Sequence, residues 1–167
     1  MEHIVSIARN NLGEYSVTQH FKEKLRDDHL YEKHKKGSKS SWLRPILILV
    51  EYFMSDEPKP KRIQTNDFHV EHILPQNPTL SSQWAKDFSE EERERYTHSL
   101  ANLTLLGGKK NTKALSQALN QDFKEKKEIY MGKPVKNDVC RYTEWTPKSL
   151  EKREKDLMSI IESVLTL

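Results

Sequence analysis

The chain has one cysteine, no long apolar run and no strong excess of charge of one sign. Because Cys140 has no second cysteine to pair with, an internal disulfide and a multi-cysteine zinc site are excluded, and a reducing compartment fits. Residues 1–9 lack the basic and then apolar pattern of a secretion signal. The most apolar window, residues 42–54, is interrupted by Arg44 and Glu51 and is too short to cross a bilayer. These absences predict a cytoplasmic protein without a membrane segment.

The net charge of +3 and the isoelectric point near 8.8 permit a nucleic-acid partner but do not argue for one. The distribution of charge is more informative, because residues 86–95 are net acidic whereas residues 107–133 contain seven lysines. Each of these lysines is more often part of a solvated face than of a phosphate-binding track. The six lysines interpreted in this way are Lys109, Lys110, Lys113, Lys124, Lys126 and Lys127.

A chain of 167 residues and 19.7 kDa has the length of one domain and can bury a core without disulfides. Apolar residues at helical spacing predict a helix within residues 16–30 and a buried helix over residues 42–54. The inner face of the second helix is expected to contain Leu43, Ile46, Leu47, Val50 and Phe53. The proline-containing residues 56–62 then form a linker.

Two strands and several helices are predicted after this linker. Alternating, β-branched residues from Phe68 to Leu74 predict a short strand that ends at Pro75. Residues 79–96 favour two short helices, the second opened by a capping box of Ser89 and Glu92. The remaining elements are a strand over residues 103–106, helices over residues 111–119 and 121–130, and a C-terminal helix with Thr146 as its N-cap and Pro147 at its first position.

The residues around the two predicted strands have the composition of a single-metal nuclease centre. Glu71 and His72 stand side by side in an apolar run, and Asn102 and Asn111 follow within about forty residues. A neutral imidazole is a suitable general base at neutral pH. A carboxylate and an amide carbonyl are oxygen ligands that suit Mg²⁺ or Mn²⁺ better than zinc.

The adjacency of Glu71 and His72 raises a geometric difficulty, because neighbouring residues of a strand point to opposite faces. A bulge or a strand end would relieve this conflict. We therefore expect irregular backbone over residues 71–74, with Pro75 marking the exit from the strand.

Each candidate residue also has a structural interpretation. His72 could be a hydrogen-bonded histidine at the edge of the core, Asn102 a turn or cap residue, and Asn111 a helix N-cap. A zinc site built from His69, His98 and Cys140 lacks support from any ligand spacing.

Several motifs in order resemble one known family. They are VEHILPQN with Trp84 after it, LANLTLL, an asparagine, FKEKKEIY at residues 123–130 and EWTPKSLEKRE before an apolar helix. This set resembles the C-terminal nuclease domain of GmrSD-type, modification-dependent restriction enzymes, a branch of the HNH (His-Me finger) endonucleases. The resemblance runs from about Phe68 to the C-terminus, with a weaker similarity in the predicted helix from Leu43 to Tyr52. Two residues depart from the usual pattern: Ala101 replaces a glycine, and Glu71 replaces the aspartate common among HNH enzymes.

The resemblance implies an α+β, predominantly helical fold with a ββα-metal (HNH) core embedded in a helical domain. Residues 1–62 would be an N-terminal helical part and linker, residues 63–131 the nuclease core, and residues 132–167 a C-terminal extension and helix, together forming one compact domain. Within the core, His72 would activate water, Glu71 and Asn111 would bind the metal, and Asn102 would hold the histidine-bearing loop. Lys109, Lys110 and Lys113 are the lysines expected to bind DNA phosphates.

The resemblance also implies a cofactor and partners. The expected activity is DNA cleavage or nicking with Mg²⁺, for which Mn²⁺ could substitute, in an anti-phage restriction system of a prokaryotic cytoplasm. The expected partners are DNA and an N-terminal, ParB-like, NTP-dependent sensor domain, which would make this chain the nuclease end of a longer polypeptide. Two alternatives stay open: a DNA-binding module that is latent without that sensor, and a homodimer formed through the C-terminal helix.

Overall fold

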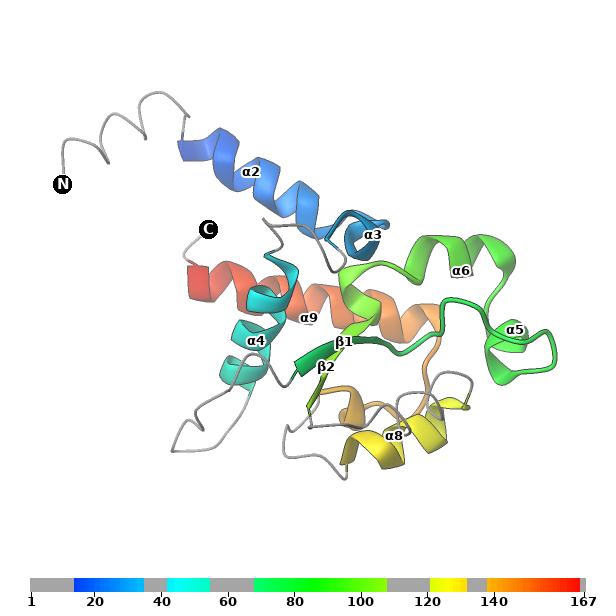
Figure 1. Ribbon diagram of the computed structural model, residues 1–167. Helices are drawn as coiled ribbons and strands as arrows, with labels where there is room; N and C mark the ends of the chain where they lie inside the picture. Colours follow the sequence, from blue (N-terminus) through cyan, green and yellow to red (C-terminus); the bar gives the residue numbers. More distant parts are fainter. Residues whose placement is uncertain (1–13, 35–41, 55–67, 108–120, 132–137, 166–167) are drawn as a thin grey trace.

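Helices make up most of the structure and surround a two-stranded sheet (Figure 1). The structure is a computed structural model, and it describes residues 14–34, 42–54, 68–107, 121–131 and 138–165. The expectation of an α+β fold that is predominantly helical is confirmed for these residues. None of the helices in these segments is long and apolar enough to span a membrane.

The first helices are α2 (Glu14–Leu25) and α3 (Leu30–His34). The helix expected within residues 16–30 is confirmed as far as Leu25, after which the structure has a turn before Leu30. The Asp27 carboxylate accepts a hydrogen bond of 2.9 Å from the His29 backbone amide. This local bond offers the backbone an alternative to helix propagation, which explains why the helix stops here.

Helix α4 (Leu43–Met54) confirms the buried helix predicted after the first loop, with one correction on its inner face. Phe53 is 52% exposed, whereas Glu51 is only 8% exposed. The buried positions repeat at intervals of three and one residues, namely Leu43, Ile46, Leu47, Val50 and Glu51. Phe53 is out of step with this repeat, so it faces solvent, and a carboxylate takes its place against the rest of the protein.

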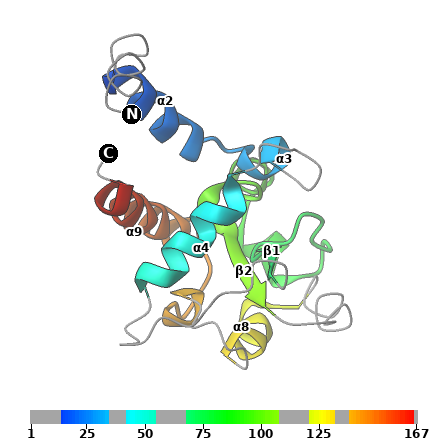
Figure 2. The same ribbon diagram turned by 60° about the vertical axis from the view of Figure 1, so that its left-hand side comes forward.

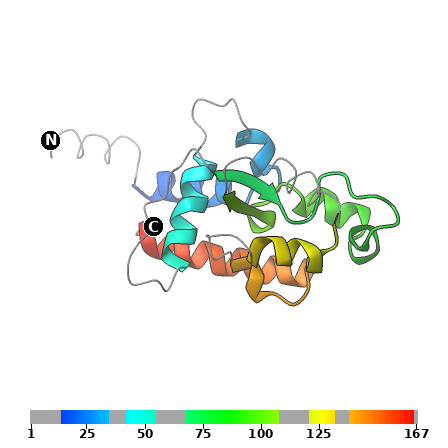
Figure 3. The same cartoon turned by 60° about the horizontal axis from the view of Figure 1, so that its bottom comes forward.

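The sheet consists of β1 (Phe68–His72) and β2 (Leu103–Gly107), which confirms the two predicted strands; the structure pairs them antiparallel. Leu103 and Leu105 belong to a core cluster with α4 and the C-terminal helix, whereas Leu106 belongs to a second cluster. Helix α3 lies on one side of the sheet and α8 (Phe123–Met131) on the other in all three ribbon views (Figure 1, Figure 2 and Figure 3). The sheet therefore separates two apolar clusters.

The remaining elements connect the two strands and close the fold. They are α5 (Gln83–Asp87), α6 (Glu90–Tyr96), the 3₁₀ turns η2 (Leu100–Asn102) and η3 (Asp138–Arg141), and α9 (Pro147–Leu165). The capping box of Ser89 and Glu92 is confirmed, with hydrogen bonds of 2.8 and 3.2 Å. Ala101 lies within η2, and because 3₁₀ backbone has negative φ, an alanine fits at this position without strain.

A buried arginine ties the C-terminal helix to the start of β2. The Arg153 guanidinium forms two hydrogen bonds with the Asp138 carboxylate, at 2.7 and 2.8 Å. Its remaining nitrogen donates to the carbonyl oxygens of Ala101 and Leu103. Since Arg153 is 2% exposed, this charge is compatible with burial only because Asp138 and the carbonyls satisfy it.

The buried carboxylate of Glu51 makes stability depend on pH. Burial and the nearby Asp138 raise the pKa of Glu51 from 4.5 to about 8. Between these values folded Glu51 keeps a proton that the unfolded chain has lost, so the contribution of Glu51 to stability falls as pH rises through this window. We expect Glu51→Gln to abolish most of this fall, measured by urea unfolding at the two ends of the window. Glu128→Gln, at an exposed position of α8, is the control that should leave it unchanged.

Candidate active site

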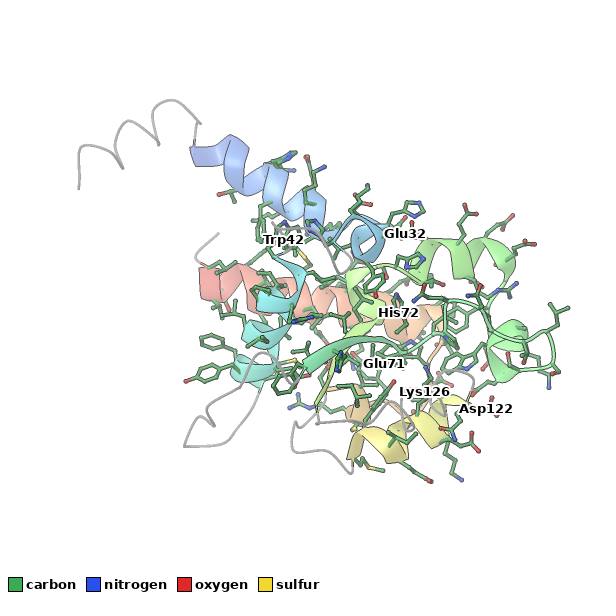
Figure 4. The ribbon with its side chains drawn as sticks, in the orientation of Figure 1. Glu32, Trp42, Glu71, His72, Asp122 and Lys126 are labelled. Carbon is green, nitrogen blue, oxygen red and sulfur yellow. The ribbon has the colours of Figure 1, made fainter. Side chains whose placement is uncertain are left out.

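Glu71 and His72 lie on a regular strand and face opposite ways. Both pair with β2 in register, Glu71 with Thr104 and His72 with Leu103. The expectation of irregular backbone over residues 71–74 is therefore wrong for Glu71 and His72, where regular pairing continues, and confirmed for Ile73 and Leu74, where the backbone bends. The alternation of a strand puts Glu71 on the α8 side and His72 on the α3 side, as Figure 4 shows.

The Glu71 carboxylate is buried and contacts Lys126 from α8. The Lys126 Nζ is 3.3 Å from Glu71 Oε1 and donates a hydrogen bond of 2.8 Å to the carbonyl oxygen of His72. Glu71 is 3% exposed and Lys126 is fully buried. Burial raises the pKa of Glu71, and the Lys126 ammonium opposes this shift. A buried carboxylate beside a buried ammonium is an ion pair cut off from water.

The imidazole of His72 is enclosed by aromatic rings on the other side of the sheet. The Tyr31 ring lies edge-on to it with a centroid distance of 4.3 Å, and the His98 ring lies at 5.3 Å. Gln76 Nε2 is 3.3 Å from His72 Nδ1, whereas the buried Nε2 has no hydrogen-bond partner among the described residues. Burial, followed by His98 and Lys126, lowers the pKa of His72 to about 3. The ring is therefore neutral across the physiological range.

Helix α3 is held in place over His72 by its backbone as well as by packing. The Tyr31 amide donates a hydrogen bond of 3.0 Å to the carbonyl oxygen of His98. Glu32 of the same helix lies 3.6 Å from the His98 Nε2. As a result, His72 is only 6% exposed.

Asn102 fixes the chain where it leaves β1. Its Oδ1 accepts hydrogen bonds from the Leu74 amide at 2.7 Å and from the Trp145 indole at 3.2 Å. Its Nδ2 donates to the carbonyl oxygens of Leu74 and Thr97, both at 2.9 Å. The Asn102 carbonyl also accepts a 3.0 Å bond from the Ile73 amide. The fully buried amide thus replaces the strand partner that Leu74 lacks, which is the loop-holding contact expected of Asn102.

Comparison of the sequence with models of known protein families identifies the family of this chain. The family model described as GmrSD restriction endonucleases, C-terminal domain, matches residues 15–160. The chain belongs to this family. No curated protein and no solved structure matches it. The GmrSD C-terminal domain match thus extends well before Phe68 and includes α2, α3 and α4, the elements that cover the His72 side of the sheet.

The structure brings together only some of the residues proposed for the site of this GmrSD C-terminal domain. Asn102 lies beside the loop that follows His72, whereas Glu71 is on the opposite side of the sheet from the imidazole. Asn111, proposed as a metal ligand, and the proposed phosphate-binding lysines lie outside the described residues. Those lysines are Lys109, Lys110 and Lys113.

Lys126 is a site residue that the sequence interpretation missed, because lysines of this segment were treated as a solvated face. A signal was present: Phe123, Lys126 and Tyr130 have the spacing of one helical face, and all three are buried in α8. The neighbouring Lys127 also makes a structural contact, a hydrogen bond of 2.7 Å to the carbonyl oxygen of Tyr142. No comparable signal in the sequence pointed to Tyr31, whose position depends on how α3 packs against the sheet.

Removing the Asn102 amide should destabilise the protein strongly. Asn102→Ala leaves four buried groups, on Leu74, Thr97 and Trp145, without the partner they have now. At about 1 to 3 kcal/mol for each unsatisfied group, we expect a loss of at least about 3 kcal/mol in urea unfolding. Thr104→Val is the matched control, since the buried Thr104 hydroxyl has no hydrogen-bond partner among the described residues. A loss below 1 kcal/mol for Asn102→Ala, on the order of a single bond, would contradict this role.

Removing the Tyr31 ring should let water reach His72. We expect Tyr31→Ala to raise the pKa of His72 from about 3 toward the ordinary value of 6.5, because burial is the main cause of the shift. The measurement is an NMR titration of the His72 ring protons. The exposed Tyr52, replaced by alanine, is the control. A pKa that stays near its present value in Tyr31→Ala would show that other groups enclose the ring.

Proposed function

We propose that this chain is a nuclease domain that hydrolyses DNA phosphodiester bonds, with His72 as the group that activates water. The observation that carries the proposal is the position of His72: a neutral imidazole at the end of β1 whose Nε2 finds no partner in the part of the chain that the structure describes, next to a loop held by Asn102. Membership of a family of restriction endonuclease C-terminal domains supports the same activity.

To act as a base, the His72 imidazole must be reached by water, and the described arrangement keeps it buried. Proton transfer needs the imidazole within hydrogen-bond reach of the attacking water, and it is most efficient when the base has a pKa near the working pH. His72 meets neither condition while Tyr31 covers it. Cleavage therefore requires the Tyr31 ring to move away from His72. This movement would expose Nε2 and would also raise the pKa of the imidazole.

We further propose that β1 and β2 are the two strands of a ββα-metal core. The supporting features are the antiparallel pairing, His72 at the end of the first strand and Asn102 directly before the second. A divalent cation such as Mg²⁺ or Mn²⁺ is the cofactor that this core implies. The described residues do not fit it by themselves, because no three candidate ligands cluster and Lys126 already neutralises Glu71. We therefore assign no step of the reaction to a metal. Chelation of divalent cations tests whether cleavage requires one.

The proposed substrate is DNA, within an anti-phage restriction system in which an NTP-dependent sensor domain recognises modified DNA. The enclosure of His72 favours a second candidate, a DNA-binding module that stays latent until such a sensor releases α3. In that case binding to DNA should persist without cleavage and should weaken with salt, because phosphate contacts release counterions.

His72→Ala tests the nuclease proposal directly. In a plasmid nicking assay with Mg²⁺ or Mn²⁺ we expect it to lower the rate by about 10² to 10⁴, the usual cost of losing a general base. His69→Ala, on the same strand but at an exposed position, should keep the parent rate. EDTA should stop cleavage by the parent. Equal rates for His72→Ala and the parent would refute the assignment, and salt-dependent binding without any cleavage would favour the latent module.

A further inference from the structure

The Lys126 ammonium occupies a site that is built to hold one cation. Its Nζ contacts the Glu71 carboxylate at 3.3 Å and the His72 carbonyl oxygen at 2.8 Å. The Trp84 ring lies on another side, with its centroid 5.8 Å from Nζ. Lys126 and Trp84 are both fully buried. A carboxylate, a carbonyl and an aromatic face are three groups that attract a cation, and here they surround the same nitrogen.

We propose that Lys126, rather than a divalent cation, is the counter-ion of Glu71, and that it positions the end of β1 that carries His72. The positioning part rests on the proposed function of His72, whereas the counter-ion part stands without it. The inference thus reassigns Glu71 from the metal ligand that the family resemblance implies to one half of a structural ion pair.

The surroundings of Glu71 suit an ammonium better than Mg²⁺. Magnesium binds oxygen ligands at about 2.1 Å in octahedral geometry and usually keeps several of its waters. Glu71 is 3% exposed, and Lys126 fills the space beside its Oε1. A hydrated ion could enter only if Lys126 left, and the lysine would then have to carry its charge through the apolar core.

Lys126 is also anchored so that it does not swing away easily. It projects from the buried face of α8, between Phe123 and Tyr130, which are 2% and 1% exposed. Both aromatic residues belong to the core cluster that contains Trp84 and Trp145. The backbone of Lys126 is therefore fixed against this cluster, and Nζ could leave Glu71 only by a change of side-chain rotamer within buried surroundings.

Together, Lys126 and Asn102 hold three consecutive residues at the end of β1. Lys126 binds the carbonyl oxygen of His72, the Asn102 backbone binds the Ile73 amide, and the Asn102 side chain binds both polar groups of the Leu74 backbone. The backbone of His72 is thus held from the α8 side of the sheet while its imidazole lies on the α3 side. A change at Lys126 should reach the imidazole through this peptide group.

A double-mutant cycle in EDTA tests the counter-ion assignment without any cleavage. Glu71→Gln and Lys126→Met should each raise the unfolding equilibrium constant by at least about 100-fold, because each leaves a buried charge unpaired. The double variant should return to within about tenfold of the parent, since both charges are gone. Lys124→Met, at an exposed position of the same helix, is the control. Single effects that simply add in the double variant would overturn the assignment.

Mn²⁺ binding, followed by the loss of the free-ion EPR signal, separates the two roles of Glu71. We expect Glu71→Gln to keep the parent affinity within about twofold, whereas loss of a true ligand should cost at least about tenfold. A tenfold loss in Glu71→Gln, or tighter binding in Lys126→Met, would show that the carboxylate serves a metal. Lack of Mn²⁺ binding by the parent would agree with the counter-ion assignment.

Plasmid cleavage by the double variant tests the positioning role. Methionine cannot donate to the His72 carbonyl, so we expect kcat to fall by at least about tenfold with KM for DNA unchanged, although stability is restored. Recovery of kcat together with stability would show that Lys126 is only a structural ion-pair partner. If the parent does not cleave DNA at all, the proposed function fails, while the stability cycle and Mn²⁺ binding still decide the counter-ion assignment.

Discussion

The arrangement around the candidate site depends on one buried amide that must satisfy the backbone where β1 ends. When Leu74 leaves the sheet, its amide and carbonyl lose the partners that a strand would provide, and both are buried. Unsatisfied buried backbone groups are costly, so the side chain of Asn102 supplies both bonds. The same amide contacts Trp145 and Thr97, which joins the C-terminal segment and the chain after α6 to the loop that follows His72.

The two-residue period of a strand explains why the acid and the histidine diverge. Their adjacency suggested a shared site, and a bulge or a strand end was needed to reconcile this with the geometry of a strand. The structure keeps regular pairing through His72, so Glu71 faces α8 and His72 faces α3. Each side chain then acquires its own surroundings, a buried ammonium for Glu71 and a set of aromatic rings for His72.

The two sides of the sheet differ in how firmly they are closed. On the α8 side, Lys126 is held by an ion pair, a carbonyl and the aromatic core. On the α3 side, a helix of five residues covers His72 through the Tyr31 ring, one backbone hydrogen bond and a partly exposed ion pair, and its buried Leu30 packs in the core. Helix α3 has one buried residue whereas α8 has three, so α3 should open at the lower cost, and we expect access to the imidazole from the α3 side.

The sequence by itself determined the elements whose signals are local. Alternation predicted the first strand, and residues 103–106 were predicted as the second. Ser89 and Glu92 predicted a capping box, Thr146 and Pro147 predicted the start of the last helix, and the ordered motifs indicated the family. Only the tertiary structure decided that Lys126 is buried against Glu71, that Phe53 is exposed and that Tyr31 encloses His72. These features arise from packing between segments far apart in the chain, whereas composition and periodicity describe neighbours along it.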